Sequence, residues 1–486
     1  MNNEKKYLIL NLPDTKKYVI HRDWAGTYGT AEIKTNNLRK RVLPIWILYL
    51  ASALKKNKIS FKIIDSQTEE FDNEKTISAA INYNPDFIIS MPCLPSYNND
   101  LKILDEIKKI NPKIKILVLG GIVNTFSEKI LNESRIDYIL IGRYPFYNNI
   151  IEFLKNYEKG KGIVYKKNNK IIRNQKIEQK NDLDNILLDT YDLIDLKKYL
   201  MKSKDKKENT VEWIPILTGV GCPYACTYCA YPICYGKKFY YKKIDRIIDE
   251  ISYLADKHKI NGFLMRDVVF TKDKKRVIEL CNKITKNNLK IKFLFETRVD
   301  LIDEDIVQHL KKAGCYQINF GVESGNSQIL KNVGKPGVNI ELLKKSFNLT
   351  KKAGILNMAH IIFGLPGENK KTIKDTYKLL KQIKADEVNF NYITPYPGTK
   401  LFEQAIIDNL IIEHNWSNYT SHNLVMQSKE LSSNELSKEG RKIERKYAIY
   451  KLLRDHRFRK RWINNFLKVK FSKLRKPTKI SIKFIF

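Results

Sequence analysis

The sequence predicts an α/β protein built from two units, a doubly wound parallel sheet of the Rossmann-like type followed by a partial (β/α)6 TIM-type barrel. Three observations support this fold class. The 486 residues exceed what one hydrophobic core usually holds. Short apolar runs alternate with helical patterns over residues 1–155. A second series of such runs follows over residues 213–405.

The first unit, residues 1–155, contains five strand-like runs separated by amphipathic stretches that suit crossover helices. In a sheet of this kind, ligands bind beyond the carboxyl ends of the strands. We therefore expect a ligand near the loops that begin at Pro13, Met91, Gly120 and Gly142, although Gly120-Gly121 is equally compatible with a tight turn. The five runs are Tyr7–Leu10, Phe61–Ile64, Phe87–Ser90, Ile114–Gly120 and Tyr138–Ile141.

The rest of the chain divides into a linker, a barrel and a C-terminal region. Residues 156–212 are expected to be the linker, with a hairpin around Asn168-Asn169. Residues 213–405 hold six strand-like runs, fewer than the eight strands of a closed barrel. Residues 406–486 are expected to be mainly helical and to end in a basic tail. The six runs are Ile214–Thr218, Gly262–Met265, Ile291–Phe295, Tyr316–Phe320, Met358–Phe363 and Glu387–Tyr392.

The formal net charge of +35 raises the question of a polyanionic partner. Lysine is spread through the whole chain, so no binding stripe is indicated, and nucleic acid is not expected as a partner. The segment after Gly440 is different, because it contains 17 Lys or Arg against two acidic residues. This segment is expected either to make peripheral contact with an anionic membrane or to be a solvated face.

The N-terminus and the cysteines indicate a cytoplasmic protein. The first apolar run, Tyr7–Leu12, is too short for a signal peptide, and the longest, Val42–Leu54, has the length of a buried helix. Seven cysteines, three of them within eight residues, favour a metal site in a reducing compartment over a disulfide framework. Membrane association is expected only through the basic tail.

One loop carries the decisive motif, directly after the strand predicted to end near Thr218. It reads Gly221-Cys222-Pro223-Tyr224-Ala225-Cys226-Thr227-Tyr228-Cys229. Three thiolates can each bind one iron of a 4Fe-4S cluster, which four cysteines normally hold, so one iron is left open to a ligand from outside the protein.

The alternative for this loop is a structural zinc site completed by Cys234, or cysteines without a metal, since tetrahedral zinc accepts four thiolates. Zinc ribbons usually pair two CxxC knuckles, which this spacing does not provide. Cys281 and Cys315 lie in apolar surroundings and are expected to be packed thiols.

Residues 213–405 resemble the radical S-adenosylmethionine (SAM) superfamily. The CxxxCxxC order with an aromatic residue, Tyr228, before the third cysteine is the signature of that family. The resemblance implies that the open iron of the cluster binds SAM, and that an electron donor of the flavodoxin or ferredoxin type drives its cleavage to a 5′-deoxyadenosyl radical. Members often carry two consecutive Asp where this chain has Arg266-Asp267. Later segments match in order: Arg266–Thr271, Glu296–Asp300, Gly321–Gly325 and Phe363–Glu368.

The same resemblance implies a set of SAM contacts at the mouth of the barrel, together with Tyr228. Asp267 is expected to accept from the amino group of SAM, and Arg298 to pair with its carboxylate. Glu323 is expected to bond the ribose hydroxyls, and Gly364 to let the backbone approach the adenine or methionyl part. A carboxylate near a strand end is also compatible with a helix cap or an ion pair.

The first unit resembles the cobalamin (B12)-binding domains that are fused to such barrels. In that resemblance, Ser90, Gly120 and Gly121 line the slot for the nucleotide tail of cobalamin. The Asp-x-His-x-x-Gly motif that supplies a lower axial histidine in many relatives is absent. The loop after the fifth strand, usually Gly-Glu-Gly-Glu, reads Gly142-Arg143-Tyr144-Pro145. The matching segments are Asn11–Pro13, Leu43–Trp46, Ile64–Ser66 and Leu119–Gly121.

Together these resemblances predict an anaerobic, cobalamin-dependent methyltransferase that uses two SAM per methylation of an unactivated carbon on a small metabolite, lipid or natural product. The alternative is a radical cyclase or oxidoreductase without methyl transfer, as in relatives similar to the anaerobic ring cyclase of bacteriochlorophyll synthesis. A tRNA methylthiotransferase fits less well, because those proteins hold three further cysteines in the first domain, where this chain has only Cys93. A redox sensor or RNA-binding protein would leave the barrel motifs without a purpose.

Overall fold

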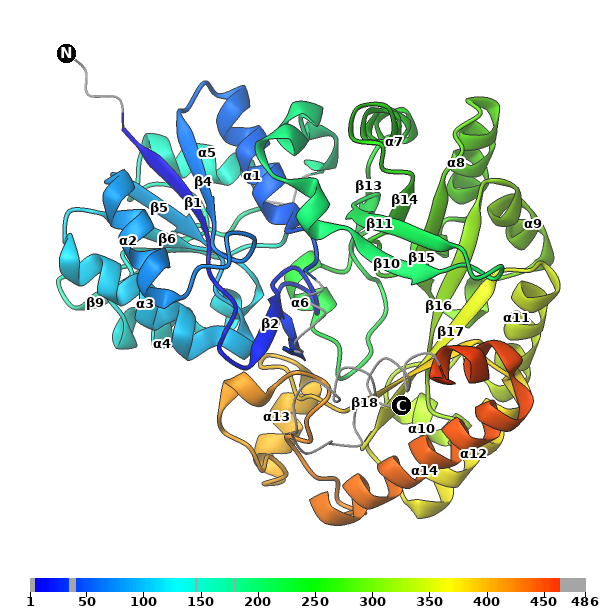
Figure 1. The fold of residues 1–486 in the computed structure, drawn as a ribbon. Coiled ribbons are helices and arrows are strands. Elements are labelled where there is room, and N and C mark those ends of the chain that lie inside the picture. The colour runs from blue at the N-terminus through cyan, green and yellow to red at the C-terminus, as the bar shows by residue number, and fades with distance from the viewer. Residues whose placement is uncertain (1–4, 35–40, 145–146, 179–180, 464–486) are drawn as a thin grey trace, which may run out of the picture.

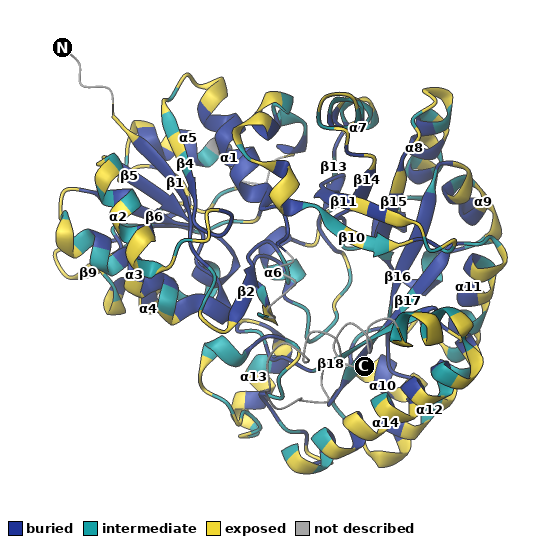
Figure 2. Ribbon diagram, viewed as in Figure 1, coloured by how far each residue is buried: buried dark blue, intermediate teal, exposed yellow. Residues whose placement is uncertain are grey.

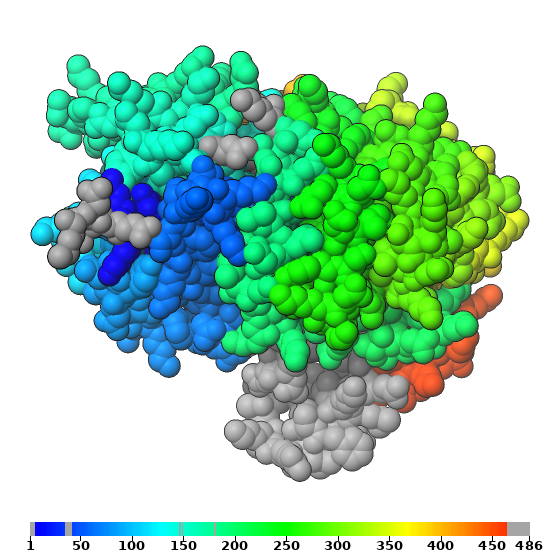
Figure 3. Space-filling view, turned by 90° about the horizontal axis from the view of Figure 1, so that it is seen from above, coloured from blue at the N-terminus to red at the C-terminus, as the bar shows by residue number. Residues whose placement is uncertain are grey.

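The computed structural model describes residues 5–34, 41–144, 147–178 and 181–463. Two seven-stranded sheets lie side by side, the first drawn in blue and cyan and the second in green to yellow (Figure 1). Buried strands form the centre of each unit, and the exposed residues lie mainly on the outer helices (Figure 2). Seen from above, the atoms of the first unit, in blue and cyan, lie directly against those of the second, in green (Figure 3).

The first sheet has the strand order β4-β1-β5-β6-β7-β8-β9, in which β4 to β7 are parallel. Strands β1 and β5 are buried along their whole length, as expected for parallel strands covered on both faces. The strands are β1 Tyr7–Asn11, β4 Phe61–Asp65, β5 Phe87–Ser90, β6 Lys115–Val118 and β7 Tyr138–Leu140. The helices are α1 Ile45–Lys56, α2 Asn73–Tyr83, α3 Tyr97–Ile110, α4 Gly121–Glu133 and α5 Tyr147–Lys155, and a hairpin of β2 Tyr18–His21 and β3 Thr30–Ile33 leaves the sheet after β1.

The segment expected to be a linker instead extends the first sheet. Strands β8 Ile163–Lys167 and β9 Lys170–Arg173 pair antiparallel with each other, and β8 pairs antiparallel with β7. The predicted hairpin is present, and both Asn168 and Asn169 have a positive φ, as a two-residue hairpin loop of this kind requires. The first unit therefore continues to residue 173, because the apolar half of β8 is buried beside β7.

The second sheet has the order β10-β11-β14-β15-β16-β17-β18, and its last six strands are parallel, as predicted for a partial barrel. The strands are β10 Met201–Lys204, β11 Thr210–Ile216, β14 Gly262–Met265, β15 Lys292–Thr297, β16 Cys315–Glu323, β17 Leu356–Phe363 and β18 Glu387–Tyr392. A two-stranded ribbon, β12 Gly219–Val220 and β13 Tyr240–Tyr241, encloses the cysteine loop. The helices are α6 Tyr231–Tyr235, α7 Ile244–His258, α8 Lys274–Lys286, α9 Glu304–Lys312, α10 Ser327–Asn332, α11 Ile340–Lys352, α12 Lys370–Ile383, α13 Lys400–Ile407 and α14 Ser433–Arg454.

Much of the basic C-terminal segment belongs to the fold. Helix α14 begins with a capping box and packs against α12. Lys451 donates to the carbonyl of Ala385 at 3.0 Å, Arg461 pairs with Glu387 at 2.8 Å, and Arg457 pairs with Asp386. These cations are therefore used inside the molecule. Residues 464–486, with the rest of the predicted tail, lie outside the described residues.

Candidate active site

The cysteine loop is held at both of its ends. Gly221 has a φ of +107°, and a Cβ there would lie 2.1 Å from the carbonyl oxygen of Lys238, so only glycine fits. The backbone N–H of Cys222 donates to the carbonyl of Gly236 at 3.0 Å, and that of Thr227 donates to Val333 at 3.2 Å. The loop is thus built into the carboxyl end of the barrel.

Cys222, Cys226 and Cys229 all line one cavity of about 450 Å³ at the carboxyl ends of the barrel strands. Burial raises the pKa of the Cys222 and Cys226 thiols, whereas the positive charges of Arg298 and Lys335 act to lower both. Thiolates are the form that binds iron, so loading a cluster would release protons from these groups.

The structure separates Cys234 from the other three. Its sulfur packs against Gly121, where an added Cβ would lie only 2.8 Å from it. Cys234 does not line the cavity. Within the described ranges, no three His, Cys, Asp or Glu side chains converge to hold a single metal ion. A cubane does not require such convergence, because each cysteine binds a different iron. The zinc alternative therefore lacks its fourth ligand.

Arg298 lines the cavity, and one of its guanidinium nitrogens has no hydrogen-bond partner in the described structure. Its Nε and Nη2 donate to the two carboxylate oxygens of Asp300 at 2.9 and 2.8 Å, and its guanidinium stacks on Tyr224 of the cysteine loop at 3.9 Å. Nη1 is buried and has no hydrogen-bond partner in the described structure. A buried donor of this kind, beside the cluster loop, suits the carboxylate of a ligand.

Glu323 also lines the cavity and is paired with a residue that carries no motif. Its Oε1 accepts from Nζ of Lys335 at 2.6 Å, and both side chains are almost fully buried. Glu323 has a φ of +61°, which a non-glycine residue rarely adopts, at a bulge in β16. The strain and the bulge turn this carboxylate into the cavity, where Tyr228 also lies.

Asp267 and Gly364 lie elsewhere than the resemblance implies. Oδ1 of Asp267 accepts from the backbone N–H groups of Thr218 and Gly219, at 3.0 and 2.8 Å, so this carboxylate positions the start of the cysteine loop. A Cβ on Gly364 would lie 2.8 Å from the side chain of Leu436, so its missing side chain serves the packing of α14. Neither residue lines the cavity, because the Asp267 carboxylate faces the backbone of the cysteine loop and the Gly364 Cα faces α14.

The residues expected to line a nucleotide-tail slot come together at the carboxyl edge of the first sheet, but protein covers them. The Ser90 hydroxyl donates to a main-chain carbonyl of β1 at 2.8 Å. A Cβ on Gly120 would lie 2.7 Å from Cγ of Met91, and one on Gly121 would lie 2.9 Å from the ring of Tyr28. The slot that the resemblance implies is filled by these neighbouring side chains.

Several cavity residues have no motif that could have revealed them. They come from the β2–β3 segment of the first unit and from β15 to β18 of the barrel, so only the fold brings them together. Examples are Trp24, Glu32, His360, Asn389 and Asn391. The cavity is therefore shared by both units.

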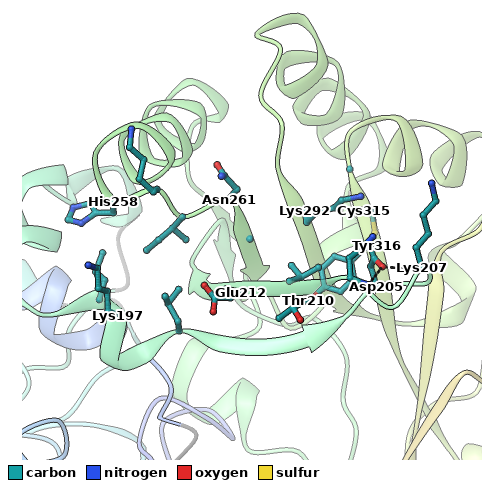
Figure 4. Close-up of a pocket in the computed structure, with 18 of the residues that line it drawn as sticks. Lys197, Asp205, Lys207, Thr210, Glu212, His258, Asn261, Lys292, Cys315 and Tyr316 are labelled. Atoms are coloured by element: carbon teal, nitrogen blue, oxygen red, sulfur yellow. Dashed lines mark hydrogen bonds between the residues drawn. The ribbon is translucent and has the colours of Figure 1, made fainter. Parts of the chain in front are cut away.

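A larger cavity, of about 1360 Å³, lies at the amino-terminal ends of the barrel strands (Figure 4). Lys197, Lys207 and Lys292 stand around it, together with the start of β11 and the end of α7. None of the residues that line it belongs to the cysteine loop. The length of the barrel strands separates it from the three thiols, so the chemistry belongs to the smaller cavity.

Comparison with known proteins agrees with both units. Residues 216–380 match the family model of the radical SAM superfamily, and residues 33–145 match that of the B12 binding domain. The barrel unit of this chain is thus a radical SAM domain. The first unit is a B12-binding domain, so the cofactors are a 4Fe-4S cluster, SAM and cobalamin.

Three relatives of this radical SAM enzyme illustrate the likeness. An uncharacterized methyltransferase of Pyrococcus horikoshii is 29% identical over 84% of this chain and 89% of its own length. An anaerobic magnesium-protoporphyrin IX monomethyl ester cyclase of Cereibacter sphaeroides is 26% identical over 87% of this chain and 71% of its own. The solved radical SAM methyltransferase TsrM of Kitasatospora setae, with cobalamin and a [4Fe-4S] cluster bound, superposes with a TM-score of 0.66 at 15% identity, covering 83% of this chain and 75% of that one. The last comparison concerns the fold.

The residues present fit these cofactors unequally. Three cysteines on one cavity without a fourth suit a cluster with an open iron, and the unused Nη1 of Arg298 suits the carboxylate of SAM. The cavity is lined by both units, so a corrinoid held by the first unit would face the cysteine loop across it. The packing around Ser90, Gly120 and Gly121 leaves no room for the nucleotide tail of cobalamin.

No helix in the described part of the chain is both long enough and apolar enough to cross a membrane.

Proposed function

We propose that this radical SAM enzyme methylates an unactivated carbon of a small metabolite, lipid or natural product, with a corrinoid as the methyl carrier. The observation that carries the proposal is the single cavity lined both by the three cysteines and by residues of the first unit, such as Trp24 and Val42. A radical generator and a methyl carrier must both reach the same carbon, and a shared cavity meets that requirement. The similarity to a methyltransferase over 89% of its length supports the same reaction.

We propose the following roles for the cavity residues. Cys222, Cys226 and Cys229 hold the cluster; when bound, the cluster and cofactors supply the electron, the radical and the methyl group. Arg298 orients SAM by its carboxylate through Nη1, and Asp300 fixes the guanidinium. Glu323, held by Lys335, accepts from hydroxyl groups of the ribose.

The wall of the cavity away from the cysteines supports a polar substrate. It is built from polar side chains of β16, β17 and β18, among them Asn319, His360 and Asn391. Nδ1 of His360 lies 3.4 Å from the amide nitrogen of Asn389, and in the tautomer in which Nδ1 accepts this N–H the proton is on Nε2. Nε2 is buried without a partner in the described structure. A substrate oxygen that accepts this hydrogen bond would fit here.

The test is incubation of anaerobically prepared, cluster-loaded enzyme with methyl-deuterated SAM, reductant, cobalamin and a small-molecule extract. Methyl transfer predicts a product that carries the intact CD3 group, with S-adenosylhomocysteine and 5′-deoxyadenosine formed in equal amounts. The Cys226→Ala variant is the control and should form neither product. If 5′-deoxyadenosine accumulates while no product carries the label, the cyclase or oxidoreductase alternative replaces methyl transfer.

Two partners complete the proposal. An electron donor of the flavodoxin or ferredoxin type would reduce the cluster, since the described chain has no second redox centre of its own among its cysteines. Peripheral contact with anionic lipid through the C-terminus rests on residues 464–486. Liposome sedimentation of the full chain against one ending at residue 463 tests it, because truncation at 441 would remove most of α14.

A further inference from the structure

The carboxyl edge of the first sheet contains a topological switch point, and the proposed function does not explain the side chains found there. Strand β1 pairs with β4 on one side and β5 on the other, so the connections after β1 and β5 leave the sheet in different directions. Doubly wound sheets bind their ligands in the crevice that forms at such a point. Here three separate groups of side chains occupy that crevice.

Arg22 is the first of these groups. Its side chain is 1% exposed, and it forms a two-point ion pair with the fully buried Asp100, at 2.6 and 3.1 Å. The same guanidinium donates to the carbonyls of Leu12 and Pro13 after β1, at 3.1 and 3.2 Å, and to that of Met91 after β5, at 3.1 Å. Arg22 thus joins the two loops whose separation would open the crevice.

A cluster of large aromatic side chains is the second group, on the face covered by α1 and α5. Trp46, Tyr144 and Tyr147 are each no more than 3% exposed and belong to the extended core that covers this face of the first sheet and continues into the barrel. The rings of Tyr144 and Tyr147 meet edge to face at 5.5 Å, and Tyr49 stacks on Tyr147 at 5.9 Å. Tyr144 stands in the loop whose usual sequence, Gly-Glu-Gly-Glu, has no large apolar side chain.

Asp23 is the third group. The amino end of a helix, with its free N–H groups, is the usual place for a phosphate in folds of this kind. At the start of α1 the carboxyl group of Asp23 takes that place, bonded to the backbone N–H groups of Ile45 and Trp46. Burial raises the pKa of Asp23 to about 7, while the Arg266 cation and these two N–H groups act to lower it. The phosphodiester of a nucleotide tail would meet this carboxyl group rather than free N–H donors.

We propose that the B12-binding domain of this chain is closed to the nucleotide tail, so that it holds a corrinoid by the ring alone and does not select its lower nucleotide. This inference rests on the corrinoid use in the proposed function. It follows from the filled crevice, the covered Gly120-Gly121 and the occupied start of α1. Expelling Arg22 from Asp100 would leave a buried charge without its partner, which is strongly unfavourable.

The test changes the cofactor and leaves the protein intact, so folding is not at issue. Full-length, cluster-loaded enzyme is titrated under anaerobic conditions with hydroxocobalamin and with diaquacobinamide, which lacks the nucleotide tail. Binding is read from the corrinoid absorption spectrum and from equilibrium dialysis. The inference predicts dissociation constants that agree within about threefold. Cobalamin binding at least tenfold more tightly than cobinamide would overturn it while leaving the proposed function intact.

A second titration uses cobalamin with a fluorophore on the ribose of its tail. If the tail stays outside the domain, the labelled cofactor binds within about threefold of the unlabelled one, and a loss of at least tenfold overturns the inference. If none of the three corrinoids binds, the inference fails together with the corrinoid part of the proposed function. Formation of 5′-deoxyadenosine by the same sample then shows whether the radical SAM activity stands on its own.

Discussion

The buried ion pair between Glu323 and Lys335 permits the most quantitative prediction. The two side chains are 8% and 6% exposed, and their charged atoms are 2.6 Å apart. Removing one partner from such a pair typically destabilises a protein by about 3–5 kcal/mol, because a charge is left in the interior. We therefore expect Lys335→Met to lower the free energy of unfolding by that amount.

Replacing both partners should undo much of this loss. The double variant Glu323→Gln with Lys335→Met leaves no uncompensated charge, so it is expected to lose less than about 2 kcal/mol. The matched control is Lys344→Met, which breaks the exposed pair with Glu341, whose side chain is 82% exposed. Exposed pairs contribute about 1 kcal/mol or less.

The assay is anaerobic guanidinium unfolding, followed by circular dichroism, for wild type and the three variants. Midpoint shifts are converted with a common slope, since the mutations leave the exposed surface almost unchanged. Iron content of the reconstituted proteins, read in parallel, separates loss of stability from loss of the cluster. A Lys335→Met variant no less stable than Lys344→Met would refute the reasoning.

Three further outcomes are expected. Cys226→Ala should abolish the bound cluster and 5′-deoxyadenosine formation, whereas Cys234→Ala, which lies away from the cavity, should keep its iron; equal iron loss in both would contradict the assignment. Arg298→Lys should raise the KM for SAM about tenfold or more at unchanged iron content, because lysine cannot keep both the two-point contact with Asp300 and a free donor; an unchanged KM counts against this role. Burial raises the pKa of Glu368 from 4.5 to about 8, so this group favours the folded state at low pH and that contribution is lost as the pH rises from about 4.5 to about 8. The free energy of unfolding of Glu368→Gln, relative to that of wild type, should therefore rise by more than about 1 kcal/mol between pH 5.5 and 8.5. A difference in unfolding midpoints that does not change with pH would show the reasoning to be wrong.

The sequence was sufficient for the elements whose patterns are local. The apolar runs of both sheets and the spacing of the three cysteines are read without knowledge of the fold, and the structure has strands at each of these runs. The hairpin at Asn168-Asn169 is local too, but its pairing with β7 joins distant segments, and no local pattern reveals such a pairing.

A motif places a residue at the end of a strand, but it does not predict whether the side chain faces the cavity or the surrounding protein. Asp267 stands where the resemblance places a SAM contact, yet its carboxylate faces the backbone of Thr218 and Gly219. Lys335 follows Glu323 by 12 residues without a motif, and only the turn after α10 brings its amine to the carboxylate. Trp46 gave no sign of filling the crevice, since an apolar helix start is typical of any buried helix.

The contacts between the two domains fix the gap across which the cofactors would act. Tyr28 of the first domain donates to the carbonyl of Pro397 at 2.7 Å, and the backbone N–H of Tyr144 donates to Cys234 in α6 at 2.7 Å. Gly26 lies so close to Tyr231 that a side chain there would be 3.1 Å from its Cα. A hinge between the domains would have to break all three contacts at once. These contacts therefore hold the β2–β3 segment of the first domain against the barrel, so the two sides of the shared cavity are positioned by the fold before any ligand enters.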